Sequence, residues 1–226
     1  MKELLYASGP AAEFRVKDPI STLTHFIGFC LSLLGMPLLL NYAAFRGEGT
    51  AAMISYSVFM LSMILLYGAS SAYHAFHISE KVDRLLKKND HMMIFVLIAG
   101  SYTPVCTVIL GGRTGAVLLA VMWALAAAGM LFKALWVTCP KWVSSVIYIA
   151  MGWAAIVVIK PLYLTLSAAG FAWLLAGGIC YTAGGVIYSL KFRRLTAVCP
   201  GFGEHEIFHI FVMLGSLCHY IMMFTF

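Results

Sequence analysis

The sequence predicts an all-α integral membrane protein with seven transmembrane helices, a cytoplasmic N-terminus and a C-terminus outside the cell. Hydrophobic residues make up 62% of the 226 residues and charged residues only 11%, whereas a soluble domain holds about 25% charged residues. A spanning helix needs about 20 mostly apolar residues, and seven such stretches follow one another. A spanning β-strand needs only about 9–11 residues of alternating character, so the length of these stretches excludes a barrel.

The first three spans are bounded by charges and glycines. They are predicted at residues 20–45, 51–76 and 92–110. The first ends at Arg46-Gly-Glu-Gly49 and the third at Gly111-Gly-Arg113, and glycine next to charge is a common helix boundary. Between the second and third lies the polar stretch 79–89, which contains four Lys or Arg residues and is expected to be a loop.

The remaining four spans are predicted at 116–137, 143–164, 169–190 and 205–226. The sixth contains glycines at intervals of seven residues, Gly170, Gly177 and Gly184. Seven residues return a helix to within about 20° of the same face, so these glycines are expected to let a neighbouring helix pack closely. Residues 20–226 thus form one seven-helix transmembrane domain, and residues 1–19 a cytoplasmic N-terminal segment without the apolar core of a signal peptide.

The distribution of Lys and Arg predicts the orientation, because cytoplasmic loops of membrane proteins are enriched in these residues. Seven spans place alternate loops on opposite sides. Three residues fall on one side: Arg46, Arg113 and Lys160. Twelve fall on the side of the N-terminus: Lys2, Arg15, Lys17, Lys81, Arg84, Lys87, Lys88, Lys133, Lys141, Lys191, Arg193 and Arg194. The N-terminus is therefore predicted to be cytoplasmic.

The charge and the cysteines point to no further function. This side bias accounts for the net charge of +6, so no nucleic-acid partner is expected, although some of these residues can hold anionic lipid headgroups. The six cysteines are scattered without a CxxC pair. Cys139 and Cys199 fall on the predicted cytoplasmic side, where thiols stay reduced, and the cysteines are expected to be small core residues.

Ionisable residues inside a membrane span mark function by default, and the predicted topology brings several of them together. His74 lies near the end of the second span, Asp90 near the start of the third, and His205 and His209 near the start of the seventh. All four positions fall near the cytoplasmic boundary. From His209 to the last residue are 17 residues, or about 25 Å of helix against a hydrocarbon core of about 30 Å.

These residues suit a zinc site. His205 and His209 are four residues apart, so they share one helix face. His74 from another helix would complete a three-histidine site, and catalytic zinc with three protein ligands keeps its fourth position for water. Asp90 is placed to orient or deprotonate that water. Ser70, four residues before His74, is placed to hydrogen-bond the water or an oxyanion.

Two other interpretations are weighed against this one. For His25, His77 and His91 we expect ordinary hydrogen-bonding histidines near the membrane interface, and for His219 a buried hydrogen-bonding residue. Residues 205–209 also match HExxH, the zinc-protease motif in which Glu206 would be the general base. An intramembrane protease takes its third ligand, an aspartate, from farther along the chain, and no acidic residue follows His209.

At these residues the sequence resembles the progestin and adipoQ receptor family. The resemblance rests on Ser70-x-x-x-His74, Asp90 and His205-x-x-x-His209. Gly100-Ser-Tyr-Thr-Pro104 and the run 204–219 resemble its bacterial branch, the hemolysin III-like proteins. The resemblance covers nearly the whole chain and implies seven spans with a cytoplasmic N-terminus. It also implies zinc bound by the three histidines, with Asp90 contacting the zinc-bound water.

The resemblance implies a function as well. Alkaline ceramidases share the arrangement of serine, histidines and aspartate, and bacterial members are tied to haemolysis and to membrane-lipid homeostasis. We therefore expect a zinc-dependent hydrolase of lipid amide or ester bonds in the cell membrane, with a sphingolipid or fatty-acyl substrate. The alternative is a non-enzymatic membrane protein with structural zinc that senses lipid state or acts as a haemolysin. The chain lacks the long N-terminal domain of the animal receptors, which argues against a similar protein ligand. No oligomeric state is predicted.

Overall fold

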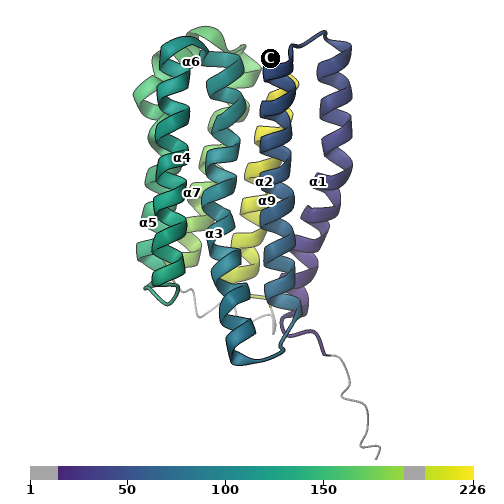
Figure 1. Cartoon of the computed structure of the whole chain (residues 1–226), viewed down its shortest axis with the longest axis vertical. Coiled ribbons are helices and arrows are strands. Elements are labelled where there is room, and N and C mark those ends of the chain that lie inside the picture. Colours follow the sequence, from purple (N-terminus) through teal and green to yellow (C-terminus); the bar gives the residue numbers. More distant parts are fainter. Residues whose placement is uncertain (1–14, 191–201) are drawn as a thin grey trace, which may run out of the picture.

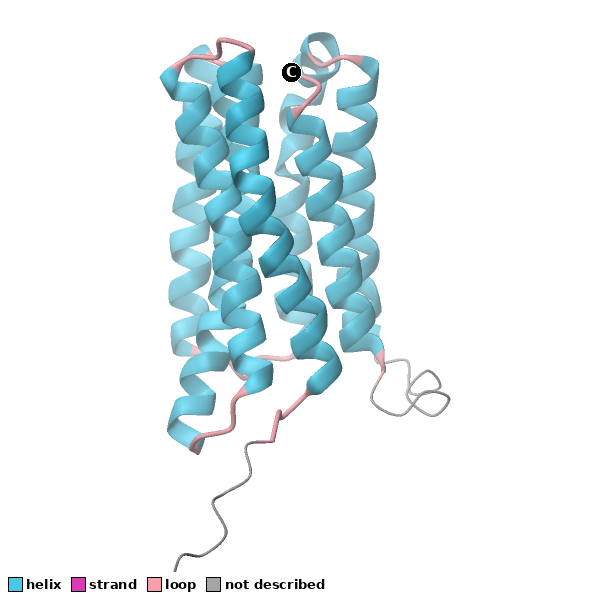
Figure 2. Ribbon diagram, turned by 90° about the vertical axis from the view of Figure 1, so that its right-hand side faces the viewer, coloured by secondary structure: helices cyan, strands magenta, loops and turns pink. Residues whose placement is uncertain are grey.

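The computed structural model describes residues 15–190 and 202–226 as a bundle of long helices, with loops only at its two ends (Figures 1 and 2). The helices are α1 (Pro19–Phe45), α2 (Thr50–Ala75), α3 (Glu80–Pro104), α4 (Gly112–Leu135), α5 (Lys141–Gly152), α6 (Ile159–Thr165), α7 (Ala168–Leu190) and α9 (Glu204–Met223). A π-helical segment, η1 (Val105–Leu110), continues α3, and a 3-10 segment, η2 (Trp153–Val158), joins α5 to α6.

These elements form seven spans that are long and apolar enough to cross a membrane, and the described residues include no β-strand. The prediction of seven transmembrane helices is confirmed, with boundaries that differ by a few residues. The fifth span differs inside: the single helix predicted at 143–164 is interrupted by η2. In the bundle, α2 packs between α1 and α3, and α9 packs mainly against α7 and also against α1.

The expectation of a loop at 79–89 is wrong. Helix α3 begins at Glu80, so that almost the whole polar stretch is helical and extends beyond the other helices at the lower end of Figure 1. Ser79 caps this helix, because its Oγ accepts a hydrogen bond from the Val82 amide (3.3 Å). Glu80 and Asp83 occupy the first turn, where carboxylates favour the positive end of the helix dipole.

The glycines of α7 pack as expected against a neighbouring helix. A Cβ atom at Gly177 would lie 2.3 Å from the His219 ring, and one at Gly184 would lie 2.8 Å from the Phe211 Cβ. Both contacts are on α9, and both are closer than a side chain tolerates. The glycine positions therefore let α9 approach α7 closely, which fixes the position of the helix that carries His205 and His209.

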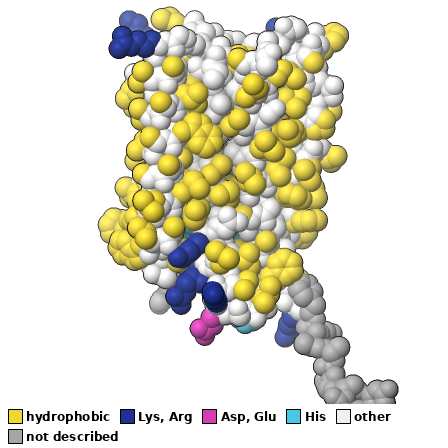
Figure 3. All heavy atoms as spheres, in the orientation of Figure 1, with side chains coloured by type: hydrophobic (Ala, Val, Ile, Leu, Met, Phe, Trp, Pro, Cys, Tyr) yellow, Lys and Arg dark blue, Asp and Glu magenta, His cyan; other side chains and the backbone are white. Residues whose placement is uncertain are grey.

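Apolar side chains cover the outside of the bundle as well as filling its core, and the interior also holds polar groups. Hydrophobic side chains cover the middle of the face shown in Figure 3, and Lys and Arg side chains are visible only towards its ends. Large apolar residues such as Leu34 and Leu38 are 66% and 64% exposed. Contact with lipid has no cost for such residues, whereas most of the buried Ser, Thr and His side chains have hydrogen-bond partners within the protein.

The charges used to predict orientation lie at the ends of the bundle where they are described. Lys2, Lys191, Arg193 and Arg194, together with Cys199 and residues 1–14 of the N-terminal segment, lie outside the described residues. Lys133, counted among these charges, is not exposed at the surface. It is buried at the end of α4, and its Nζ contacts the Cys139 Sγ (3.2 Å) and donates to the Ser144 Oγ (2.5 Å).

The orientation itself is a prediction: the N-terminus and residues 79–89 in the cytoplasm and Phe226 outside. The reason is the excess of Lys and Arg at the end of the bundle that carries the N-terminus. A reporter that is active only in the cytoplasm should be inactive when fused after Phe226 and active when inserted near residue 85. The reverse pattern would contradict the prediction.

Candidate metal centre

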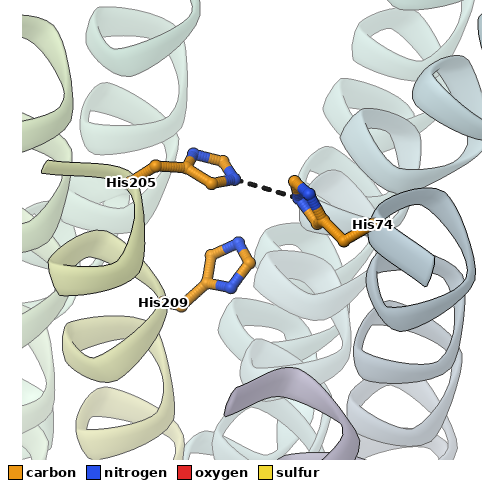
Figure 4. A group of neighbouring side chains, drawn as sticks. All are labelled: His74, His205 and His209. Carbon is orange, nitrogen blue, oxygen red and sulfur yellow. Dashed lines mark hydrogen bonds between the residues drawn. The ribbon is translucent and has the colours of Figure 1, made fainter. Parts of the chain in front are cut away.

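Three histidines from two helices meet at the end of the bundle that carries the N-terminus (Figure 4). His74 lies in the last turn of α2, and His205 and His209 lie in the first turns of α9. The Nε2 atoms of His74 and His205 are 2.9 Å apart. The ring centroids of His205 and His209 are 4.5 Å apart, as the spacing of four residues on one helix predicts.

The donor atoms fit a metal ion. One ring nitrogen from each of the three histidines lies within 4.8 Å of the other two. Ligands held ~2.0–2.1 Å from a tetrahedral zinc lie about 3.4 Å apart, so small side-chain rotations suffice to close the site. Three imidazoles with a free fourth position are the donor set of catalytic zinc. Sequence analysis placed these three residues together, and the structure brings them together.

A carboxylate orients His74. Asp18 Oδ2 lies 2.9 Å from His74 Nδ1, and the Asp18 amide donates to the His74 carbonyl (2.9 Å). A carboxylate accepts a proton but has none to give, so His74 carries its proton on Nδ1. Its Nε2 then carries a lone pair, which in this structure accepts a hydrogen bond from His205 Nε2 (2.9 Å). This is the carboxylate–histidine arrangement that raises the basicity of a metal ligand.

The Thr24 hydroxyl orients His209. The Thr24 hydroxyl donates to the Ser21 carbonyl (2.9 Å), and its Oγ1 lies 3.1 Å from His209 Nδ1. Because the hydroxyl proton is used on Ser21, Oγ1 accepts from the ring N–H. His209 therefore also presents a free Nε2. The start of α1 thus holds two of the three histidines in the tautomer that a metal ion requires.

His25 lies against the same cluster and was expected to be an ordinary interfacial histidine. It is 2% exposed, and its ring stacks on that of His209 with centroids 3.5 Å apart and planes inclined by 10°. Neither of its ring nitrogens has a hydrogen-bond partner among the described residues. The stacking adds a third contact from α1 that restricts rotation of the His209 ring.

Asp90 and Ser70 line a cavity that begins beside the histidines. His205, His209 and His25 line the same end of it. Asp90 is buried, and its Oδ2 lies 3.4 Å from His91 Nδ1. Ser70 is fully buried, and its Oγ has no hydrogen-bond partner among the described residues. The cavity therefore offers a carboxylate and an unpaired hydroxyl to a molecule placed near the three histidines.

Glu206, the base that a protease would need, is engaged elsewhere. Its carboxylate accepts hydrogen bonds from the Ser21 hydroxyl and from the Gly203 amide (2.8 Å). These contacts tie the start of α9 to α1 and cap α9, and Glu206 is not among the residues that line the cavity. The geometry favours a structural role for this residue.

The other histidines differ in their surroundings. His77 is exposed and pairs with Asp83, and His91 Nδ1 donates to the Lys87 carbonyl (2.9 Å), so both are ordinary hydrogen-bonding residues as expected.

Sequence analysis did not identify Asp18 and Thr24. An aspartate before Pro19 is typical of a helix N-cap, but the Asp18 side chain makes no capping hydrogen bond. This departure is visible only in three dimensions.

Comparison with known proteins identifies the family of this chain. Residues 15–220 match the family model described as haemolysin-III related. The chain is 40% identical over 202 residues to "Hemolysin-3" of Bacillus cereus, covering 89% of this chain and 88% of the relative. It is 38% identical over 204 residues to "Hemolysin-3 homolog" of Bacillus subtilis (strain 168), covering 90% and 91%.

A more distant similarity reaches the adiponectin receptors. The chain is 24% identical over 228 aligned residues to "Adiponectin receptor protein" of Drosophila melanogaster, which covers 92% of this chain and 50% of that protein. The resemblance to the hemolysin III-like branch is confirmed by the family match and by the two Bacillus relatives. The chain belongs to the haemolysin-III related family of multi-span membrane proteins.

Proposed function

We propose that this protein is a zinc-dependent hydrolase of lipid amide or ester bonds, with its centre near the cytoplasmic face of the cell membrane. One observation carries the proposal: three histidines with metal-ligand spacing, a buried aspartate and an unpaired buried serine meet at one end of an apolar cavity. His74, His205 and His209 would hold the zinc ion. A bound zinc supplies Lewis acidity and an acidified water.

The cavity supports a lipid substrate. Apart from its polar ends, its lining is aliphatic and aromatic, with Leu66, Ile94 and Leu97 among the residues. Apolar sites with a few convergent polar groups are typical of small-molecule binding. A fatty-acyl chain can exchange its contacts with bilayer lipid for contacts with this apolar lining at little cost. Ceramide and related acyl lipids are the substrates proposed.

The chain's own residues have separate tasks in this reaction. Asp90 would accept the proton of the attacking water and return it to the amine or alcohol that leaves when the C–N or C–O bond breaks, since it is the buried carboxylate that lines the cavity beside the histidines. The Ser70 hydroxyl donates a hydrogen bond to the oxygen that becomes negatively charged when the carbonyl is attacked. Asp18 and Thr24 hold the histidine tautomers.

The proposal is tested by fatty-acid release from ceramide and related acyl lipids in liposomes. Purified protein should contain about one zinc per chain and release fatty acid, and chelation should abolish both until zinc is restored. Protein that contains zinc but cleaves none of these lipids would contradict the hydrolase.

The names of the Bacillus relatives favour a second candidate, a haemolysin with structural zinc. Such a protein would release dye from liposomes that lack a cleavable lipid. It would also close its metal centre with a fourth protein ligand, whereas a catalytic centre keeps that position open. Dye release without lipid cleavage would support this candidate.

Asp18→Asn should weaken zinc binding about 10- to 100-fold, the usual cost of losing a carboxylate that orients a histidine ligand. The asparagine has nearly the same shape but lacks the charge that favours the Nδ1–H tautomer of His74. Competition with a chelator of known affinity measures the change.

Asp83→Asn is the matched control, because it removes a carboxylate from an exposed histidine, His77, outside the centre. It should leave zinc affinity unchanged. Equal affinities in the wild type and Asp18→Asn would show that Asp18 does not orient the ligand.

A further inference from the structure

The cavity that starts at the metal centre extends to a second polar position deep in the bundle. His219 on α9 lines it far from the three histidines, and Tyr102 and Trp153 line this deep end as well. The same three residues border an adjoining smaller cavity, so the space continues past His219. The main cavity has a volume of about 110 Å³, whereas one buried water needs only ~10–15 Å³.

His219 has an unpaired nitrogen. Its Nε2 lies 3.4 Å from the Leu174 carbonyl on α7, a long hydrogen bond in which the ring N–H donates. Its Nδ1 is buried and has no partner among the described residues. With the proton on Nε2, Nδ1 is an acceptor lone pair. A buried acceptor left unpaired is unfavourable, so an occupant that supplies a donor is favoured.

Packing fixes the direction in which this nitrogen points. The Cδ2–Nε2 edge of the ring lies against Gly177, where a Cβ atom would be only 2.3–2.4 Å away. Nδ1 is on the opposite side of the ring from that edge and thus points away from the Gly177 backbone. The absence of a side chain at Gly177 is what admits the imidazole at this depth.

The distance between the two polar ends of the cavity sets the length of acyl chain that fits between them. His209 and His219 are ten residues apart on one helix, which is about 15 Å at ~1.5 Å per residue. An extended hydrocarbon chain advances ~1.25 Å per carbon, because its C–C bonds of ~1.5 Å are inclined to the chain axis, and so covers this distance with about twelve carbon atoms. The lining between the ends includes Leu97, Ile98 and Val212, which suits methylene groups.

We propose that His219 Nδ1 is a specificity subsite that accepts a hydrogen bond from a hydroxyl group near the twelfth carbon of a bound fatty-acyl chain. The ligand class is a mid-chain hydroxylated acyl lipid with its carboxyl end at the three histidines. The position of the hydroxyl along the chain rests on the proposed function, because the proposed function places the carboxyl end of the lipid at the three histidines. Because Nδ1 can only accept, a hydroxyl is recognised and a ketone at the same carbon is not.

The test is binding of octadecanoic acid and its 12-hydroxy, 12-oxo and 2-hydroxy derivatives to the full chain in lipid nanodiscs, by competition with a radiolabelled acid. The 12-hydroxy acid should bind about 2- to 12-fold tighter than the 12-oxo acid, the range that one buried neutral hydrogen bond supplies. Equal binding of these two acids to the wild type would overturn the proposal, and this comparison needs no variant.

His219→Leu should abolish the preference for the 12-hydroxy acid and leave binding of the 2-hydroxy acid unchanged. Dividing the preference for the 12-hydroxy acid in the wild type by that in the variant cancels differences in how the acids partition into lipid. His77→Leu is the matched control, a histidine of the same bundle that is exposed and outside the cavity, and it should keep the preference. Persistence of the preference in His219→Leu would assign it to another residue.

The proposed function and the His219 subsite can fail separately, because different measurements test them. Without catalysis, no lipid is hydrolysed, but the ratio of the 12-hydroxy and 12-oxo affinities is measured by binding and still reports on His219. Removal of zinc should weaken both acids by the same factor, because both present the same carboxyl end to the histidines.

Discussion

Replacement of His205, His209 or His74 by alanine is expected to reduce zinc from about one ion per chain to a trace. Each of the three supplies a ring nitrogen within 4.8 Å of the others. Two remaining imidazoles leave zinc with half of its tetrahedral set, and no other His, Cys, Asp or Glu in the described part of the chain groups with them. Elemental analysis of the purified variants measures the loss.

Controls for this experiment come from the same chain. His77→Ala removes an exposed imidazole that bonds to Asp83. His91→Ala removes one that bonds to the Lys87 carbonyl and lies beside Asp90 but outside the three-histidine group. Both should keep full zinc occupancy. Circular dichroism should show unchanged helix content in all five variants, since side-chain loss at a helix end leaves the spans intact. Full occupancy in the three site variants would remove the metal centre from consideration.

Asp90→Asn is expected to retain zinc and the fold but to lose turnover by a factor towards the upper end of ~10²–10⁴, the contribution of a general base. Asparagine has nearly the same shape as aspartate but does not accept a proton at neutral pH. Asp90 lines the cavity beside His205 and His209 without belonging to the three-histidine group, so zinc content should not change. Fatty-acid release from ceramide, with chelated protein as the blank, provides the measurement.

Ser70→Ala and Glu206→Gln complete this series. Ser70→Ala should lose about 10²–10³ in rate, the usual contribution of one donor to an oxyanion. Glu206→Gln should stay largely active, because the Glu206 carboxylate bonds to Ser21 and Gly203 rather than facing the cavity. An inactive Glu206→Gln that retains zinc and fold would instead support the HExxH protease. If Asp90→Asn is as active as the wild type, Asp90 is not the base.

The seven spans and the residues of the candidate centre follow from the sequence because their signals are local. A run of about 20 apolar residues can only be satisfied as a helix in lipid, whatever its neighbours are. The spacing of His205 and His209 sets a shared helix face, and alternation of the spans brings His74 and Asp90 to the same end. Even the glycines of α7 predict a close neighbour, which proves to be α9.

Predictions from single segments were wrong where the composition of a segment fits more than one structure. The stretch 79–89 is polar enough for a loop, but its capping Ser79 and the carboxylates of the first turn favour a helix that extends beyond the apolar span. The fifth span is apolar throughout, so its composition gives no sign of the 3-10 segment η2 at Trp153–Val158. Apolar runs indicate that a span exists and say little about its internal geometry.

The amino-acid sequence by itself determined the number of spans and the end of the bundle at which the three histidines meet, since both depend on periodicity and length along single segments. Only the tertiary structure decided what surrounds them. Asp18, Thr24 and His25 reach His74 and His209 across sequence separations of 56 to 185 residues. The unpaired nitrogen of His219 likewise depends on where α7 packs. Such contacts depend on how the helices rotate and pack against one another, which no single segment specifies.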